Sequence, residues 1–411
     1  MKYDFDKPVK RRGTDSIKWR LYGDAVIPLW VADMDFVSPQ PIIQALHERV
    51  EHGVFGYVRP SGELIGAIQE RLKRLYCWEV PEEHIVFVPG VVTGLNFAFQ
   101  LFADPGDEVL IQPPVYSHFV TDPVVRGRSV TEVPLVKKTD TYEIDFDAFE
   151  DAITPGTKIF VLCNPHNPVG RVLTREELGR LATICLRHRL LICADEIHCD
   201  LLYPGYRHTP IATLSNEVAD RTITFMSPSK TFNLAGLKSS FAVISNASLR
   251  KAWIKSSQGL IPHVNIMGLT AALAGFRHGQ EWLDQCLAYL DGNREFLEQY
   301  IRERLPSLRM TKMEATYLAW LDCNESGIPG NPFEFFLKKS RVALTDGNEC
   351  GTGGQGFVRL NFACSRKILV EALERMAHSV RRLQEFGERQ NSGEVEEEGW
   401  KRSNSAGKNQ E

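Results

Sequence analysis

The sequence predicts an α/β protein: a large domain with a mostly parallel sheet flanked by helices, and a smaller α+β domain. Between residues 85 and 244, short apolar runs alternate with helical patterns. Runs such as Lys158–Cys163 and Leu190–Ala194 are apolar without alternation, which indicates strands buried on both faces and hence a parallel sheet. After about residue 305, short strands mix with helices, which is typical of an α+β domain.

Length and composition agree with this class. The 411 residues exceed what one core comfortably holds, and 43% hydrophobic and 24% charged residues are typical of a globular protein. The formal net charge of −4 gives no indication of a nucleic-acid or membrane partner. Residues 1–7 lack the apolar stretch of a secretory signal, and no apolar run is long enough to span a bilayer. We therefore expect a cytoplasmic protein.

The nine cysteines are scattered and form no CxxC pair. Several lie within apolar strands or helices, where a reduced cysteine behaves as a small hydrophobic residue. We expect cytosolic thiols, with neither a disulfide framework nor a zinc or other metal site.

Capping and turn residues define the first helices. Ser38 is expected to cap a helix with Pro39 at its first position and Gly53 past its end. An amphipathic helix is expected from Ser61 to about Trp78. Later helices are expected at 91–102, 174–188, 332–340 and 366–387, with a helical region at 245–305. Strands are expected at 85–88, 108–111, 158–163, 190–194, 222–226, 239–244, 317–321, 342–344 and 357–362.

Polar residues follow several of these strands directly. The run Asn164-Pro-His-Asn-Pro-Val-Gly170 follows one strand, and Asp195 follows the next. Lys230 lies in a hydroxyl-rich loop, Ser227-Pro-Ser-Lys230, between two apolar strands. Residues 90–94 open a helix whose free N–H groups suit a phosphate. Because α/β sheets bind ligands at the carboxyl ends of their strands, we expect one site here.

Each of these features alone has an ordinary structural explanation. An Asn-Pro pair is usually a turn, an acid after a strand is often a helix cap, and a lysine in a turn is usually exposed. Together they provide a phosphate cradle, an acid for a ring nitrogen, an amide and an amine nucleophile. Pyridoxal 5'-phosphate (PLP) requires this set of groups.

Two other motifs do not predict nucleotide chemistry. Residues 351–356 spell GxGxxG, but a strand is expected after them where a dinucleotide fingerprint needs a helix. Residues 195–198 spell DExH, but the chain contains no GxxxxGK[ST] phosphate loop to accompany it.

The motifs at 164–170, 194–198 and 227–236 resemble the fold-type I PLP-dependent aminotransferase superfamily. The segment Trp30–Phe36, His198 and the run 232–236 are similar to its cystathionine β-lyase (C–S lyase) branch. The resemblance covers nearly the whole chain and implies a seven-stranded sheet. It also implies a large PLP-binding domain at 46–285 and a small domain formed by 1–45 and 286–388. The charged, aperiodic residues 389–411 are expected to be a disordered tail.

The resemblance also implies roles for the cofactor site. Lys230 would bind PLP covalently, Asp195 would pair with the ring nitrogen, Asn167 would bond the ring oxygen, and Tyr116 would stack on the ring. The phosphate would be held by Val92, Thr93, Ser227, Ser229 and Lys238. His198 stands where many aminotransferases have tyrosine, so its contact with the ring stays open.

Further roles concern the substrate and a second subunit. Arg359 would clamp the substrate carboxylate, beside Asn167 and with Trp30 in the pocket wall. Tyr57 resembles a tyrosine that reaches the phosphate of the neighbouring subunit, so we expect a homodimer with shared sites.

The branch implies α,β-elimination of cystathionine or a related S-substituted cysteine, giving a thiol such as homocysteine, pyruvate and ammonia, in methionine biosynthesis. Residue chemistry alone does not distinguish this lyase reaction from that of a class I/II aminotransferase. A PLP- or metabolite-sensing regulatory protein is a further alternative.

Overall fold

The computed structural model describes residues 2–391 and contains a seven-stranded sheet in the order β2-β10-β9-β8-β7-β3-β4. Its strands are β2 (Ile85–Val88), β3 (Glu108–Ile111), β4 (Ser129–Glu132), β7 (Thr157–Cys163), β8 (Leu191–Asp195), β9 (Thr222–Met226) and β10 (Ser240–Ile244). β10 pairs antiparallel with β2 and β9, and the remaining pairs are parallel. The predicted mostly parallel seven-stranded sheet is confirmed.

Both faces of this sheet are buried, because neighbouring residues of one strand enter different cores. The flanking helices are α4 (Val91–Phe102), α5 (Ser117–Val125), α6 (Phe146–Asp151), α7 (Arg175–Arg187), α8 (Asn216–Asp220) and α10 (Ala247–Ser257). In β7, Phe160 and Leu162 join the core beneath α6 and α7, whereas Ile159 and Val161 join the core beneath α4, α5 and α10. This explains why the strands lack the alternation of a half-exposed sheet.

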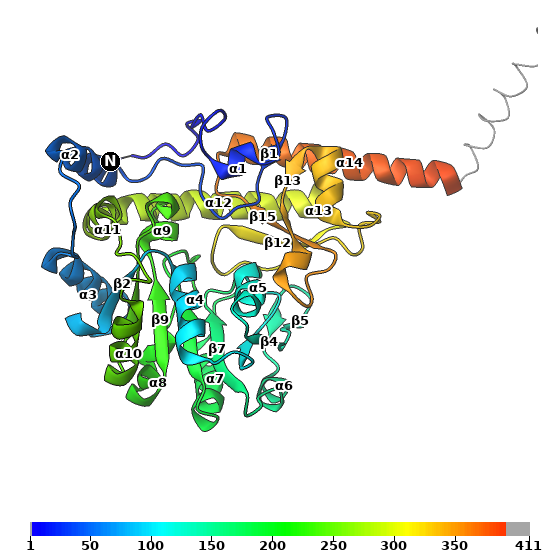
Figure 1. Ribbon diagram of the computed structural model, residues 1–411. Coiled ribbons are helices and arrows are strands. Elements are labelled where there is room, and N and C mark those ends of the chain that lie inside the picture. The colour runs from blue at the N-terminus through cyan, green and yellow to red at the C-terminus, as the bar shows by residue number, and fades with distance from the viewer. Residues whose placement is uncertain (1, 392–411) are drawn as a thin grey trace, which may run out of the picture.

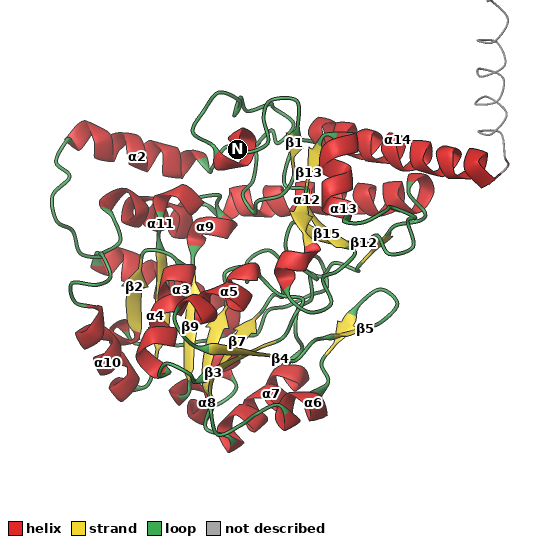
Figure 2. Cartoon of the chain, turned by 45° about the vertical axis from the view of Figure 1, so that its right-hand side comes forward, coloured by secondary structure: helices red, strands yellow, loops and turns green. Residues whose placement is uncertain are grey.

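The first helices differ slightly from the prediction. They are α1 (Ile17–Arg20), α2 (Gln40–His52) and α3 (Gly62–Tyr76). Pro39, not Ser38, is the N-cap of α2, because the Ser38 hydroxyl donates to the Asn233 carbonyl instead. Gly53 follows the helix with φ 74°, as expected of a left-handed cap. The chain between α2 and α3 runs along the outside of the molecule, as Figure 2 shows.

A second sheet lies above the first (Figure 1). It pairs β11 (Arg309–Met310), β12 (Leu318–Asp322), β15 (Phe357–Asn361) and β14 (Thr345–Asp346), all antiparallel. Short pairs join β1 (Ile27–Pro28) with β13 (Val342–Ala343), and β5 (Val136–Lys137) with β6 (Tyr142–Glu143). The other helices are α9 (Pro228–Thr231), α11 (Ile266–His278), α12 (Gln280–Arg304), α13 (Pro332–Phe335) with a π-helical turn at Phe336–Ser340, and α14 (Arg366–Asn391).

The predicted domain boundaries, 46–285 against 1–45 with 286–388, stay a prediction. One apolar core does combine residues of the N-terminal segment, such as Leu29, with residues of the second sheet and α14, such as Leu360 and Leu373. The disordered tail is expected from residue 389, but residues 389–391 continue α14. The remainder of that tail, 392–411, lies outside the described residues. Among residues 2–391, no helix has the length and apolar character needed to cross a membrane.

Helix α4 packs so closely on the sheet that Gly94 has no room for a side chain. A Cβ at Gly94 would lie 2.5 Å from the Phe225 ring. We expect Gly94→Ala to lower the free energy of unfolding by about 1–3 kcal/mol, because the ring or the helix has to move. Gly66→Ala in α3, where a Cβ meets nothing, is the control and is expected to stabilise by up to about 1 kcal/mol. Urea unfolding measures both, and equal effects would contradict this account of the packing.

Candidate active site

A cavity of about 210 Å³ lies at the carboxyl edge of β7, β8 and β9. It is lined by eleven of the residues predicted for the site, namely Val92, Thr93, Tyr116, Asn167, Asp195, His198, Ser227, Ser229, Lys230, Lys238 and Arg359. Tyr57 and Trp30 do not line it. The structure therefore brings together residues that lie up to about 270 positions apart in the sequence.

Lys230 lies on α9, a single helical turn rather than the predicted loop. Ser227 begins this turn, since its hydroxyl oxygen accepts from the Ser229 N–H at 3.0 Å. The Lys230 Nζ donates to the Ala32 carbonyl at 2.6 Å. Desolvation by burial, reinforced by the nearby Arg359 charge, lowers the pKa of Lys230 to about 8. The amine is therefore available as a nucleophile and base near neutral pH.

Asp195 ends the buried strand β8 and is 5% exposed. One carboxylate oxygen accepts from the Ile197 N–H at 3.0 Å. Burial raises the pKa of Asp195 to about 7, although that hydrogen bond and the Lys230 charge oppose the change. A buried carboxyl on the wall of a cavity is suited to a positively charged or protonated nitrogen.

Arg359 projects from the middle of β15 and is 6% exposed. Its guanidinium donates to Asn167 Oδ1, the Trp30 carbonyl and Thr345 Oγ1, each at 3.0 Å. Its Nε has no hydrogen-bond partner, and no carboxylate within the described part of the chain forms an ion pair with it. A buried cation bonded only to neutral groups can take an anion from solution.

His198 and Tyr116 remain uncharged near neutral pH. Burial, with the charges of Lys230 and Arg359, lowers the pKa of His198 to about 3. Its buried Nδ1 has no hydrogen-bond partner among the described residues, and the residue lines the cavity. Burial raises the pKa of Tyr116 to about 12. Both rings can therefore exchange neutral hydrogen bonds with a bound molecule.

The end of the cavity near α4 is suited to an anion. The first N–H groups of an α-helix have no partner within the helix, and α4 begins at Val91 beside the cavity. Lys238 lines the same cavity and contributes a positive charge to it. The Ser227 and Ser229 hydroxyls currently donate to the Ser239 carbonyl, at 2.6 and 3.4 Å.

Trp30 and Tyr57 are placed differently from the other candidates. The Trp30 indole N–H donates to the Lys18 carbonyl at 3.1 Å, and only the Trp30 backbone carbonyl contacts Arg359. Its neighbours Val31 and Ala32 line the cavity in its place. Tyr57 is fully exposed on the loop between α2 and α3.

A buried charge network that the sequence did not reveal holds the segment 30–36. The Lys18 ammonium lies 3.3 Å from Asp33 and 2.9 Å from Asp35, and its side chain is fully buried. Arg11 pairs with the same two carboxylates at 2.7 and 2.5 Å. The two acids of the Trp30–Phe36 motif were the one sequence signal for this network. Their partners lie in a stretch without helical or strand periodicity, so the pairing could not be predicted. The network fixes the backbone whose Ala32 carbonyl receives Lys230.

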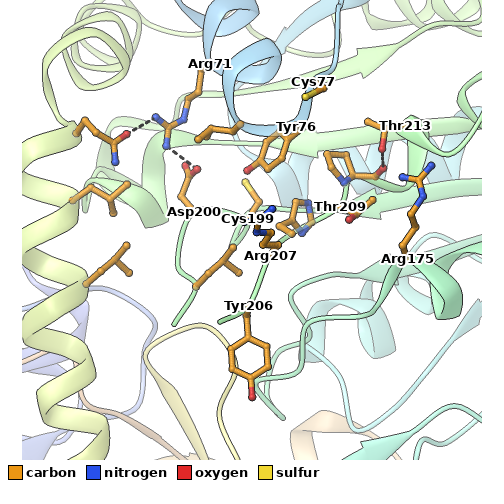
Figure 3. Close-up of a pocket in the computed structure, with 17 residues that line it drawn as sticks. Arg71, Tyr76, Cys77, Arg175, Cys199, Asp200, Tyr206, Arg207, Thr209 and Thr213 are labelled. Atoms are coloured by element: carbon orange, nitrogen blue, oxygen red, sulfur yellow. Dashed lines mark hydrogen bonds and ion pairs between the residues drawn. The ribbon is translucent and has the colours of Figure 1, made fainter. Parts of the chain in front are cut away.

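A second cavity, of about 500 Å³, lies between α3, α12 and the segment after β8 (Figure 3). Arg71 and Asp200 form a buried ion pair in its wall, with 2.7 Å between nitrogen and oxygen. The other Asp200 oxygen accepts from Thr231, the residue after Lys230, at 2.8 Å. No predicted site residue lines this cavity. The ion pair in its wall therefore helps to hold α9, the turn that carries Lys230, in place.

In the part of the chain that the structure describes, the acidic, imidazole and thiol groups are not arranged as a metal centre. Within residues 2–391, no cluster of three or more His, Cys, Asp or Glu side chains could hold a metal ion. All nine cysteines are free thiols, and eight of them are buried.

The fold and the site define a class of protein. The chain belongs to the aminotransferase class I and II family, whose model matches residues 25–376. It is 40% identical over 381 residues to the protein named cystathionine beta-lyase PatB from Bacillus subtilis (strain 168), covering 91% of this chain and 98% of that protein.

Solved structures agree with this family assignment. Cystalysin from Treponema denticola, which contains a pyridoxal 5'-phosphate cofactor, superimposes with a TM-score of 0.90 at 33% identity, covering 93% of this chain and 100% of that one. The PLP-bound C–S lyase from Staphylococcus hominis superimposes with a TM-score of 0.87 at 33% identity, covering 92% and 98%.

The buried Asp195 carboxyl has a consequence for stability in the ligand-free protein. Its pKa is raised to about 7, above the unfolded value of about 3.9, so its contribution is present at low pH and lost as pH rises through 7. We expect Asp195→Asn to stabilise the ligand-free protein at pH 8 by roughly 2 kcal/mol more than at pH 5. Urea unfolding at both pH values tests this, with the exposed Asp15→Asn as a control that shows no such difference. A gain independent of pH would be the contrary result.

Proposed function

We propose that this protein is a PLP-dependent C–S β-lyase that converts cystathionine or a related S-substituted cysteine to a thiol such as homocysteine, pyruvate and ammonia. The observation that carries the proposal is the buried Arg359, which lacks an acidic partner in the described chain and lies in the same cavity as the Lys230 amine. Such a pair of groups suits an α-amino acid. The names of the relatives above favour the lyase reaction over transamination.

The groups around the cavity fit PLP. A low-pKa amine, an acid with a raised pKa, an unpartnered imidazole nitrogen and a helix N-terminus are all present. Lys230 would hold the cofactor covalently, Asp195 would pair with the ring nitrogen, and Tyr116 would stack on the ring. Asn167 would donate a hydrogen bond to the ring oxygen. His198, whose Nδ1 has no partner in the described chain, lines the same cavity and is available to the bound cofactor. The phosphate would be bound by Val92, Thr93, Ser227, Ser229 and Lys238.

When bound, PLP supplies an electron sink that stabilises negative charge at the substrate Cα. The residues of the chain do the rest. Arg359 binds the substrate carboxylate through its guanidinium, whose Nε–H has no other partner, and fixes its orientation. Lys230 would be released when the substrate amine replaces it on the cofactor. Its free amine, whose pKa is lowered to about 8, would then take the Cα proton as a general base. Asp195 would stay charged when paired with a protonated ring nitrogen, because the positive partner would offset the cost of its burial.

The active unit would be a homodimer in which Tyr57 reaches the phosphate site of the other subunit. The full exposure of Tyr57, away from the cavity of its own chain, supports this assignment. Free thiols at all nine cysteines suit a reducing compartment, so the cytoplasm is the proposed location. A role in methionine biosynthesis follows if homocysteine is the thiol released. Trp30 would act on the substrate through its carbonyl, which orients Arg359.

The lyase reaction is tested by incubating the purified protein and PLP with cystathionine and measuring thiol and pyruvate. We expect both products in equal amounts, and we expect Lys230→Ala to lose the cofactor absorption band that responds to substrate. Amino transfer dependent on a keto acid, without pyruvate, would instead identify an aminotransferase. PLP binding without turnover of any amino acid would identify a sensor.

Subunit complementation tests the shared site. Lys230→Ala and Tyr57→Ala proteins are each expected to have little activity, because each lacks one part of every site. After the two are mixed and reassembled, half of the sites in each hybrid dimer are intact, so about a quarter of wild-type activity should return. Each variant mixed with itself is the control. If the mixture stays inactive although hybrid dimers form, Tyr57 does not act across the interface.

A further inference from the structure

A buried carboxylate–imidazole pair lies directly behind the candidate active site. Glu196 follows Asp195 in the chain, and its side chain and that of His208 are both completely buried. Their Oε2 and Nε2 atoms are 2.8 Å apart. The other Glu196 oxygen accepts from the Ile211 N–H at 3.1 Å. Neither residue lines the cofactor cavity, so the proposed reaction does not account for them.

The pair connects the strand ends that carry the site. The Glu196 N–H donates to the Phe225 carbonyl of β9 at 3.0 Å, and the Asn164 N–H donates to the Asp195 carbonyl at 3.1 Å. His208 Nδ1 lies 3.4 Å from Asn164 Nδ2. One hydrogen-bonded unit therefore joins the ends of β7, β8 and β9, which lead to Asn167, Asp195 and Lys230 respectively.

The hydrogen bonds also determine the charge of the pair. Asn164 Oδ1 accepts from the Leu173 N–H at 3.0 Å, so Asn164 turns its amide nitrogen, which can only donate, toward His208. His208 Nδ1 is therefore the acceptor and its proton is on Nε2, which donates to Glu196. If both ring nitrogens of His208 carried a proton, the Nδ1–H would face the Asn164 amide N–H, and neither group could accept a hydrogen bond. This arrangement favours a His208 ring with one proton, and it leaves the negative charge of Glu196 solvated by two N–H donors, from His208 and Ile211.

We propose that Glu196, held by His208, is a positioning residue for Asp195: it fixes the end of β8 and places a second negative charge behind the carboxylate that receives the cofactor ring nitrogen. The charge favours a proton on that nitrogen. In the ligand-free protein, burial is the main cause that raises the pKa of Asp195, and the Glu196 charge adds to it. The inference rests on the proposed PLP chemistry.

The test uses the full chain with PLP and does not depend on turnover. For Glu196→Gln, which keeps the shape but removes the charge, we expect about tenfold weaker PLP binding or more. We also expect the pH midpoint of the bound cofactor's absorbance change to fall by about one pH unit, because protonated forms lose a favourable charge. Glu196→Asp should recover part of both. Unchanged PLP affinity and midpoint, with only a lower melting temperature, would overturn the proposal.

Two further variants make the test specific. His208→Gln can donate to Glu196 and accept from Asn164, so it should keep both values near those of the wild type. A raised midpoint in His208→Gln would show that His208 carries a positive charge, and would overturn the charge assignment. Glu150 and His188 form the same kind of pair at the surface, 2.9 Å apart, so Glu150→Gln is the matched control and should change neither value.

The outcomes separate this inference from the function. A protein that binds PLP and responds to Glu196→Gln, but releases no pyruvate, refutes the lyase assignment and supports the role of Glu196. A protein that binds no PLP refutes both.

Discussion

The burial of charged groups around one small cavity is the constraint on which the site depends. Lys230, Asp195 and Arg359 lose water there, and the same desolvation lowers the pKa of the amine and raises that of the acid. Such groups cost stability unless they are held rigidly by well-placed donors and acceptors. The strand ends of the seven-stranded sheet provide that rigidity for Asp195 and Lys230, and β15 of the second sheet provides it for Arg359, since the backbone groups of these strands are already paired.

The structure contains two kinds of buried charge, and they have different meanings. Lys18 with Asp35 and Arg71 with Asp200 are paired, and they join segments around the site without facing the cofactor cavity. Arg359, in contrast, is bonded only to neutral groups of the described chain. Paired charges fix the architecture, whereas an unpaired buried charge on a cavity wall indicates where a ligand supplies the missing partner.

Much of this arrangement could be predicted from the sequence, because polar residues directly after continuous apolar runs have to lie at the end of a buried sheet. Asp195 and Asn167 were recognisable in this way. What could not be predicted depends on contacts between distant segments. The Ser38 hydroxyl bonds to Asn233 instead of capping α2, and Lys18 finds its acids only after folding. β4 was not predicted, because its residues Ser129–Glu132 are partly exposed and not continuously apolar.

The arrangement also bears on whether the site catalyses or only senses. Binding of PLP requires an amine of lowered pKa, an acid for the ring nitrogen and a site for the phosphate. A protein that only senses PLP would need no further groups. Arg359 is not needed for that binding. Yet ion pairs from Lys18 and Arg11 to Asp33 hold the segment 30–33 in place. In this segment the Trp30 carbonyl accepts a hydrogen bond from Arg359, and the Ala32 carbonyl accepts one from Lys230. One rigid stretch of backbone thus sets the guanidinium and the amine relative to each other. That geometry suits a second molecule that carries a carboxylate at one end and an amino group at the other and binds between them.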